Sequence, residues 1–285
     1  MILVIGATGN IGSEIVKLCV EDGTPVKGAA RSPEKLIKSY GNKVETTHFD
    51  FTDESTWESS LDGVDTVFFI APQTDAHTTV QSFLAMLKNS SVAYVLYSSG
   101  RTTGGITGSP MNRVEQVVQQ SGIPFTIIRP GWFMQNFNGW IGDTLSTDRA
   151  FYLSAGRSKT AFVDVRDIAA VAHKILKNSS HVGEILELSG EEALDHYQVA
   201  GTISDVTGIE VRYVELSSDE YIRHLVKQGW PEQDAAFFAY LYDLVRLGNE
   251  EDISPDVRKV LGRAPITFTD FARDYRLEFL RLLNG

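Results

Sequence analysis

Three glycines near the start of the chain have the spacing of a phosphate-binding turn. An apolar run over residues 2–5 stops at Gly6, and Gly9 and Gly12 follow at three-residue steps. Glycines at such a junction let the backbone turn sharply, approach a pyrophosphate closely and pack the helix against the strand. The first helical turn then presents unpaired N–H groups and a positive dipole end. An ordinary tight turn has the same spacing, but a place after the first strand of an α/β-type chain favours a dinucleotide site.

Cations follow the second predicted strand. Arg31 lies nineteen residues after Gly12, and Lys35 follows one turn later. A carboxylate near this position accepts hydrogen bonds from the ribose of NAD, whereas an arginine accommodates the 2′-phosphate of NADP. Residues 30–32 contain no carboxylate, and a guanidinium offers a planar fork that matches phosphate. The sequence therefore predicts NADP(H), and a solvated surface arginine is the alternative. Thr8, Asn10 and Ile11 are predicted to line the pyrophosphate.

Further candidates end the later predicted strands. Asp50 and Phe51 follow the third strand and could flank the adenine, with helix capping by Asp50 as an equal alternative. Ala71 and Pro72 follow the fourth, where the chain should pass beneath the ribose and the nicotinamide. Ser98 ends the fifth, and its hydroxyl could face the transferred hydride or only form a turn.

Aromatic and amide side chains follow the sixth predicted strand. Pro130 and the glycine after it would let the backbone approach the nicotinamide amide. Aromatic rings beyond them could stack on a flat substrate or belong to the core. Asn136 could orient a substrate or cap a helix. The candidates for substrate contact are Trp132, Phe133, Asn136, Trp140 and Phe162.

A doubly wound parallel sheet would bring these residues to one edge. Short apolar, β-branched runs alternate with helical patterns in the first half of the chain, which indicates a sheet covered by helices on both faces. Ligands bind such sheets beyond the carboxyl ends of the strands. The predicted strands are 2–5, 26–30, 44–48, 66–70, 93–97 and 126–129, and the predicted helices are 11–21, 33–39, 54–61, 76–88 and 111–120.

The alternation breaks down beyond residue 130. A mainly helical C-terminal part with an amphipathic stripe over 231–247 is expected, and the stripe suits a core face or a dimer face. The predicted architecture is α/β: a Rossmann domain over 1–150, whose sheet is completed by segments within 160–190, and a smaller substrate or lid domain over 151–285. Later predicted elements are strands at 162–165, 185–188 and 211–215 and a helix at 167–177.

The amino-acid composition limits the classes of binding partner that the chain can have. The net charge of −11 and the pI near 5.0 argue against nucleic acid and anionic membranes, because no basic surplus exists to neutralise phosphates. A single cysteine, Cys19, excludes an intramolecular disulfide and favours the cytoplasm. Neither a signal peptide nor a bilayer-spanning apolar run is found, and the histidines lack metal-ligand spacing. We expect a small-molecule substrate, no metal and a chain that could form a homodimer.

Several sequence blocks together resemble one known family. They are Gly-Ala-Thr-Gly-Asn-Ile-Gly at 6–12, Tyr-Ser-Ser-Gly at 97–100 and the block at 121–136, which contains Thr-Ile-Ile-Arg-Pro-Gly-Trp-Phe-Met-Gln-Asn. With these blocks the chain resembles the NmrA-like branch of the atypical short-chain dehydrogenases/reductases. The resemblance implies a Rossmann domain with a smaller substrate domain. The family includes NAD(P)H-dependent quinone oxidoreductases, triphenylmethane dye reductases, fungal iminium reductases and redox-sensing regulators that bind the cofactor without turnover.

One difference between this chain and the wider superfamily bears on the reaction mechanism. The wider superfamily uses a Tyr-x-x-x-Lys pair as its proton donor, and the corresponding window, 109–115, contains neither residue. An iminium or triarylmethyl cation needs only hydride, and the anion formed from a quinone can take a proton from water. The sequence therefore predicts an NADPH-dependent reductase of a flat electron-poor substrate. A non-catalytic NADP(H) sensor that acts through a protein partner is the alternative, and an isomerase or cyclase that keeps the cofactor as a scaffold is a third hypothesis.

Overall fold

The computed structural model describes residues 1–72 and 75–284, and the chain divides into two compact units. Unit 1 comprises Met1–Pro130, Val165–Leu188 and Asp256–Arg263, and unit 2 comprises Gly131–Asp164, Ser189–Pro255 and Ala264–Gly285. The predicted boundary at residue 150 differs from this division, because the chain enters unit 2 directly after Pro130. The segment beyond Pro130 contributes buried side chains to the core of unit 2, which explains the earlier transition.

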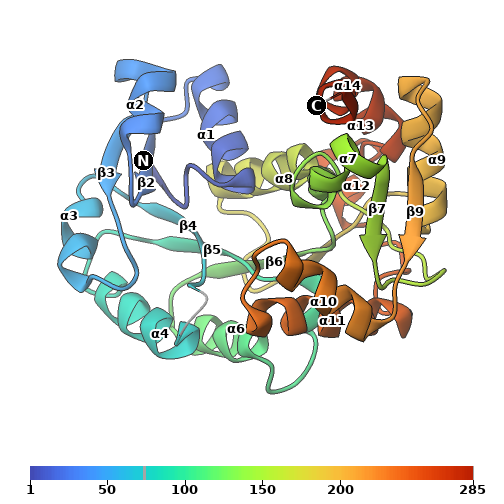
Figure 1. Ribbon diagram of the computed structural model, residues 1–285. Coiled ribbons are helices and arrows are strands. Elements are labelled where there is room, and N and C mark those ends of the chain that lie inside the picture. The colour runs from blue at the N-terminus through green and yellow to red at the C-terminus, as the bar shows by residue number, and fades with distance from the viewer. Residues whose placement is uncertain (73–74, 285) are drawn as a thin grey trace. The chain divides into compact units, whose positions relative to one another are not determined.

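Within the described residues, unit 1 contains a seven-stranded parallel sheet in the order β3-β2-β1-β4-β5-β6-β8 (Figure 1). Side chains of the central strands are buried on both faces, which is why these strands are continuous apolar runs in the sequence. The doubly wound fold is confirmed. The strands are β1 (Ile2–Ile5), β2 (Val26–Ala30), β3 (Glu45–His48), β4 (Thr66–Ile70), β5 (Tyr94–Ser98), β6 (Phe125–Pro130) and β8 (Ile185–Leu188).

Helices cover both faces of this sheet (Figure 1). Helix α1 packs against α8, which also packs against α12, and α4 packs against α6 on the other face. Cys19 on α1 is fully buried, and burial raises the pKa of its thiol to about 12, so it is a core residue. The helices of unit 1 are α1 (Asn10–Asp22), α2 (Glu34–Tyr40), η1 (Gly41–Lys43), η2 (Glu54–Thr56), α3 (Trp57–Ser60), α4 (Ala76–Leu87), α5 (Arg101–Gly104), α6 (Pro110–Gln120), α8 (Val165–Asn178) and α12 (Asp256–Leu261).

Unit 2 is mainly helical around a two-stranded parallel sheet of β7 and β9. The predicted strand at 162–165 is wrong, because this segment makes only an isolated bridge between Phe133 and Val163. The elements of unit 2 are η3 (Met134–Asn136), η4 (Trp140–Thr144), α7 (Leu145–Asp148), β7 (Ala150–Leu153), α9 (His196–Thr207), β9 (Arg212–Glu215), α10 (Ser218–Lys227), α11 (Glu232–Arg246), α13 (Phe268–Asp274) and α14 (Arg276–Asn284).

The amphipathic stripe of α11 faces the core of unit 2. Ala235, Tyr242 and Val245 are almost completely buried there, so this part of the stripe packs in the core of unit 2. The other side of α11 exposes Phe237 and Tyr240. A homodimer stays a prediction.

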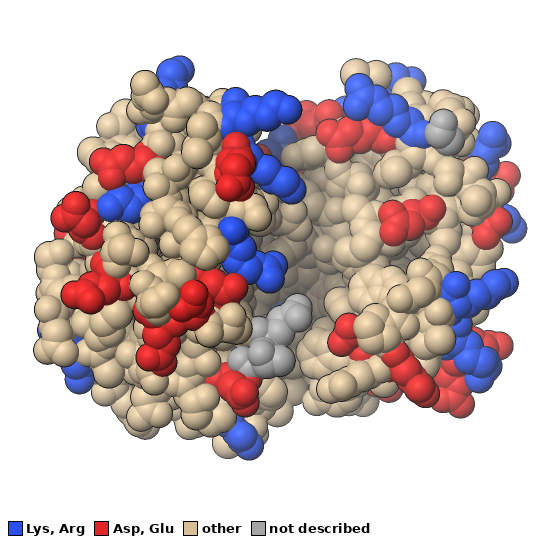
Figure 2. All heavy atoms as spheres, turned by 60° about the vertical axis from the view of Figure 1, so that its left-hand side comes forward, with Lys and Arg blue, Asp and Glu red and all other residues tan. Residues whose placement is uncertain are grey.

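Charge is mixed on the visible surface. Figure 2 shows Asp and Glu side chains spread among Lys and Arg, without a single broad basic area on this face. This distribution agrees with the net charge of −11. In the part of the chain that the structure describes, no helix is both long enough and apolar enough to cross a bilayer.

Candidate functional site

The turn between β1 and α1 has the geometry that the glycine spacing predicts. Gly6 adopts a φ of +80°, and the Gly9 N–H donates to the Gly6 carbonyl oxygen at 2.9 Å. A Cβ on Gly12 would lie 2.3 Å from that same oxygen, so a side chain at position 12 would push the helix away from the turn. The glycines therefore hold α1 directly against the end of β1.

The first turn of α1 is open to a ligand. Thr8, Gly9 and Asn10 are exposed, and no side chain of the described residues caps the helix at Gly9. No acidic residue lies in the first helical turn either. An uncapped helix start leaves N–H donors and the positive dipole end available, which suits a pyrophosphate. Ile11 is only 3% exposed, so its side chain belongs to the core and only its backbone could line the phosphates.

Charged groups gather where β2 and β3 end. Arg31 directly follows β2 and is exposed, and Lys35 is exposed on α2. Asp50 accepts hydrogen bonds from the backbone and the hydroxyl of Thr52, at 2.9 and 2.8 Å. These bonds, and more weakly the charge of Arg31, hold the pKa of Asp50 below its usual value. The Asp50 carboxylate therefore forms a local turn rather than a helix cap, and Arg31 is the cation that a 2′-phosphate could meet.

The ring of Phe51 packs in an aromatic cluster beside this edge. It lies 5.0 Å from Phe49 and 5.4 Å from Phe83, measured between ring centroids, and it is half-buried. One part of the ring thus stabilises the core while the rest remains accessible. An adenine contact by Phe51 stays a prediction.

The strand register brings the remaining predicted cofactor residues to the same edge. Ile70 pairs with Ser98 and Ser98 with Ile128, so the carboxyl ends of β4, β5 and β6 are in line. Ser98 is 3% exposed, and Ala71 and Pro72, which follow β4, are half-buried. Pro130, the last residue of β6, is buried at this edge of the sheet. Every predicted cofactor residue therefore belongs to unit 1.

A buried ion pair links α6, which contains most of the window 109–115, to the end of β6. Glu115 on α6 is completely buried, and it accepts two hydrogen bonds from Arg129, from Nε at 2.9 Å and from Nη2 at 2.6 Å. Arg129 also donates to the Gly104 carbonyl oxygen at 3.2 Å. The pair fixes α5 to the end of β6. Sequence analysis missed it, because nothing in the spacing links residues 115 and 129.

The predicted substrate residues of unit 2 differ in accessibility. Phe162 is 2% exposed and lies among Phe137, His196 and Phe268, so it is a core residue and the predicted substrate contact is corrected. Trp140 is half-buried, and its ring contacts a neighbouring tryptophan and phenylalanine of unit 2. Phe133 and Asn136 are half-buried, and Asn136 ends η3.

Trp132 lies among residues that sequence reasoning did not select. Its indole ring packs against Tyr242 with ring centroids 4.7 Å apart, and Tyr242 packs against Tyr221 at 5.4 Å. His196 lies 6.0 Å from Tyr242, and burial lowers the pKa of His196 to about 4. No sequence spacing indicates these contacts, because the residues lie on different segments of unit 2.

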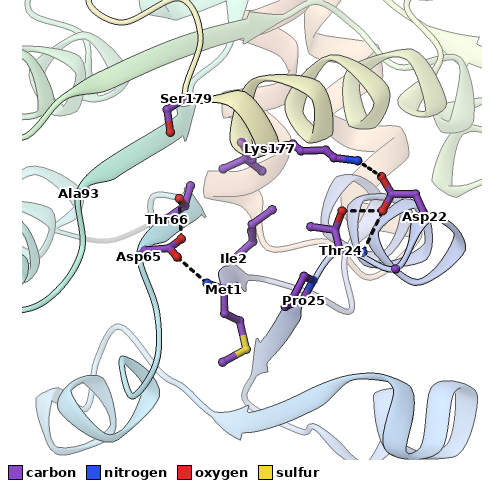
Figure 3. A pocket seen from close by; sticks show the side chains of 12 residues that line it. Met1, Ile2, Asp22, Thr24, Pro25, Asp65, Thr66, Ala93, Lys177 and Ser179 are labelled. Atoms are coloured by element: carbon purple, nitrogen blue, oxygen red, sulfur yellow. Dashed lines mark hydrogen bonds and ion pairs between the residues drawn. The ribbon is translucent and has the colours of Figure 1, made fainter.

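A separate hollow of about 560 Å³ lies at the amino ends of the strands (Figure 3). It is lined by the first residues of β1 and β4 and by the chain after α1 and α8. Its charged groups pair with each other: Lys177 donates to Asp22 at 2.7 Å, and the Met1 nitrogen donates to Asp65 at 2.7 Å. Because ligands bind doubly wound sheets at the carboxyl ends, this hollow is not the cofactor site.

Comparison with known proteins agrees with this geometry. The model of the NmrA-like family matches residues 1–272. An NAD(P)H azoreductase of Xenophilus azovorans is 32% identical, over 98% of this chain and 99% of its own. An agroclavine dehydrogenase of Claviceps fusiformis is 29% identical over 96% of each chain. The fold also matches an NADPH complex of a quinone oxidoreductase from Escherichia coli, with a TM-score of 0.84 and 23% identity over 96% of this chain and 99% of that chain.

Proposed function

The chain belongs to the NmrA-like family, and from this premise we propose that it is an NADPH-dependent reductase of flat, electron-poor organic substrates. The related azoreductase and agroclavine dehydrogenase support an oxidoreductase. The observation that carries the proposal is the uncapped start of α1 above the glycine turn, on the same sheet edge as Arg31.

The residues of this edge fit NADP(H). The backbone N–H groups that begin α1 would hold the pyrophosphate, since Gly12 leaves no side chain between the helix and the turn. Arg31 and Lys35 would bind the 2′-phosphate, and no carboxylate at residues 30–32 opposes it. The ends of β4, β5 and β6 would position the nicotinamide. When bound, NADPH supplies the hydride.

The chain's own residues orient the reactants rather than donate a proton. Glu115 on α6 and Arg129 at the end of β6 form an ion pair, and the window 109–115 contains neither the tyrosine nor the lysine of the superfamily's proton-donor pair. A cationic electrophile needs no proton, and water can protonate the anion that forms from a quinone. Catalysis then depends mainly on holding the nicotinamide and the substrate in a reactive orientation.

The first experiment measures NADPH consumption by the purified protein with a para-quinone, a triarylmethane dye and a cyclic iminium ion. Saturable turnover with any of them is expected. NADPH binding without turnover of any member would overturn the reductase proposal and favour the sensor, which requires unequal binding of the oxidised and reduced cofactor. Product formation without net NADPH consumption would indicate the isomerase.

Arg31→Glu tests the cofactor assignment. Loss of charge-assisted hydrogen bonds to the 2′-phosphate should raise the Kd for NADPH about 10- to 100-fold relative to the change for NADH. Lys174→Glu on α8 is the control, because Lys174 is exposed and the substitution changes the net charge equally. Equal weakening of NADPH and NADH binding in Arg31→Glu would refute the role of Arg31.

A further inference from the structure

His48 lies at the end of β3, beside the segment of unit 1 that contains Arg31. Strands β2 and β3 are in register with Ala30 opposite His48, and Arg31 is the next residue of the chain. The Nδ1 atom of His48 lies 3.1 Å from the carbonyl oxygen of Arg31. The backbone hydrogen bonds of the two strands end just before this contact, where the Phe49 N–H donates to the Ala30 carbonyl oxygen at 3.1 Å. The imidazole therefore links the backbone at Arg31 to β3.

This hydrogen bond determines which nitrogen of the imidazole remains for a ligand. A carbonyl oxygen can only accept a hydrogen bond, so Nδ1 of His48 holds the proton in this contact. The neutral ring then has a lone pair on Nε2, whereas the protonated ring has an N–H there. The His48 side chain is exposed, and Nε2 has no hydrogen-bond partner within the described residues. An anion at this edge of the sheet could therefore accept a hydrogen bond from Nε2 only when the ring is charged.

His48 and Arg31 act electrostatically on the same neighbouring group. Asp50 follows β3, and its pKa is held below the usual value first by the hydrogen bonds from Thr52 and more weakly by the charges of Arg31 and His48. Arg31 is exposed, and Lys35 is exposed on α2. A phosphate monoester has up to about two negative charges at neutral pH. A 2′-phosphate bound by Arg31 would therefore lie within electrostatic range of His48 as well.

The elements that pack against β3 contribute further charged groups, none of them a histidine. On β2, Lys27 forms an ion pair with Glu45 at 3.6 Å, and Glu45 lies three residues before His48, about 10 Å along the strand. On α3, Glu58 is exposed. Carboxylates, lysines and arginines ordinarily keep their charges between about pH 6.5 and about pH 8.5, whereas histidine loses its charge over this range. His48 is therefore the side chain of this set whose charge changes near neutral pH.

We propose that His48 is a third group of the 2′-phosphate site, and that its protonated ring donates a hydrogen bond from Nε2–H to the 2′-phosphate of NADP(H). The inference rests on the proposed role of Arg31 and adds a residue that determines cofactor specificity. Because only the charged imidazole can donate from Nε2, binding of NADP(H) takes up a proton, whereas binding of NAD(H) does not. The preference for NADP(H) over NAD(H) therefore increases as the pH falls from about 8.5 to about 6.5.

The test is calorimetric titration of NADP⁺ and NAD⁺ into wild type and three variants at about pH 8.5 and about pH 6.5. His48→Asn keeps a side-chain N–H that can donate to the Arg31 carbonyl oxygen, but it cannot become charged. His48→Phe removes both the hydrogen bond and the charge. His181→Gln is the matched control, because His181 belongs to the same unit, precedes β8 and pairs with Glu184 at 3.0 Å.

The quantity compared is the ratio of the Kd for NAD⁺ to the Kd for NADP⁺. We expect its increase from high to low pH to be about three- to tenfold greater in wild type and in His181→Gln than in His48→Asn. Protonation of the 2′-phosphate itself, with a pKa of about 6, acts equally in all of them and cancels in this comparison. His48→Phe should have a lower ratio than His48→Asn at both pH values, because the Arg31 backbone also loses its hydrogen bond. Parallel pH profiles in wild type and His48→Asn overturn the inference.

A second measurement counts the protons directly. Titrations at about pH 7.5 in buffers of different ionisation enthalpy should show that NADP⁺ binding takes up more protons in wild type than in His48→Asn, with no such difference for NAD⁺. Equal proton uptake in the two proteins, or a wild type that binds NADP⁺ no more tightly than NAD⁺, would overturn the inference. Neither measurement requires turnover. If no member of the substrate panel oxidises NADPH, the reductase proposal fails, while these titrations still decide the role of His48.

Discussion

The two units treat their polar groups in opposite ways. In unit 1 the buried carboxylate of Glu115 is fully paired with Arg129, whereas the start of α1 lacks a side-chain cap among the described residues. In unit 2 the helices α9 and α10 begin with complete capping boxes, whereas several buried polar atoms, among them Trp132 Nε1 and the Tyr242 hydroxyl, have no hydrogen-bond partner among the described residues. Unit 1 therefore leaves the N–H groups of an exposed helix start without a side-chain partner, whereas unit 2 leaves several side-chain groups unpartnered inside its core.

This contrast separates binding capacity from structural stabilisation. An exposed, uncapped helix start can be satisfied by an anion, whereas the unpartnered side-chain groups of unit 2 are enclosed in its core. The capped helices and the paired charges stabilise the fold instead. Substitutions at the start of α1 should therefore change cofactor affinity, whereas substitutions in the capped helices and the paired charges should change stability.

The largest expected effect concerns the paired charge of unit 1. Glu115→Ala leaves the Arg129 guanidinium without its main partner and should lower the free energy of unfolding by about 3–5 kcal/mol. Urea unfolding measures this loss. Glu184→Ala is the control, because Glu184 is an exposed carboxylate that pairs with His181 at 3.0 Å, and its loss should cost less than about 1 kcal/mol. Similar losses of unfolding free energy in Glu115→Ala and Glu184→Ala would contradict a stabilising role for the Glu115–Arg129 pair.

The next prediction concerns a variant in which the start of α1 gains a side-chain cap. In Gly9→Asp the new carboxylate would compete with the pyrophosphate for the same N–H groups, so the Kd for NADPH should rise at least about 100-fold. Calorimetric titration measures the affinity, and thermal unfolding shows that the apoprotein remains folded. Gly201→Ala is the matched control, because a Cβ there meets nothing within 4 Å and Gly201 lies inside α9. Unchanged NADPH affinity in Gly9→Asp would place the pyrophosphate elsewhere.

A third prediction concerns His196, a buried histidine whose ring centroid lies 6.0 Å from that of Tyr242. Because burial lowers the folded-state pKa of His196 from 6.5 to about 4, the unfolded chain binds the proton more tightly. The stability from neutral His196 is therefore complete above pH 6.5 and is lost as the pH falls toward 4, by up to about 3 kcal/mol. His196→Phe should lose less stability than wild type between pH 7 and pH 5 in urea unfolding. An identical pH dependence of the unfolding free energy in wild type and in His196→Phe would contradict this prediction.

The smallest effect concerns the capped helices of unit 2. Ser217 accepts a hydrogen bond from the Glu220 N–H at 3.3 Å, and Glu220 accepts one from the Ser217 N–H at 2.8 Å. Ser217→Ala should lower the melting temperature by the equivalent of about 1 kcal/mol and leave NADPH affinity at the wild-type value. A change in affinity comparable to that of Gly9→Asp would remove the distinction between the two kinds of helix start.

The sequence predicted unit 1 well, because parallel strands buried on both faces are continuous apolar runs and because the glycine turn acts through the backbone. It failed where pairing depends on distant segments. β7 (Ala150–Leu153) is too short to be distinguished from other apolar runs, and its partner β9 follows some sixty residues later. The contact of Trp132 with Tyr242, like the pair of Glu115 and Arg129, has no local signature. Residues 73 and 74, beside the predicted nicotinamide position, lie outside the described residues.

Unit 1 is built from three separate chain segments, and this limits where two family members can be joined in a chimeric protein. Strand β8 pairs with β6, and α8 covers α1 through contacts that include the Lys177–Asp22 ion pair, although the long segment from Gly131 to Asp164 belongs to unit 2. A chimera joined once near residue 150 would therefore combine the β6 of one parent with the β8 of another. Exchange of the whole of unit 1 between two family members requires five crossover points, one after Pro130 and one at each end of the two later segments.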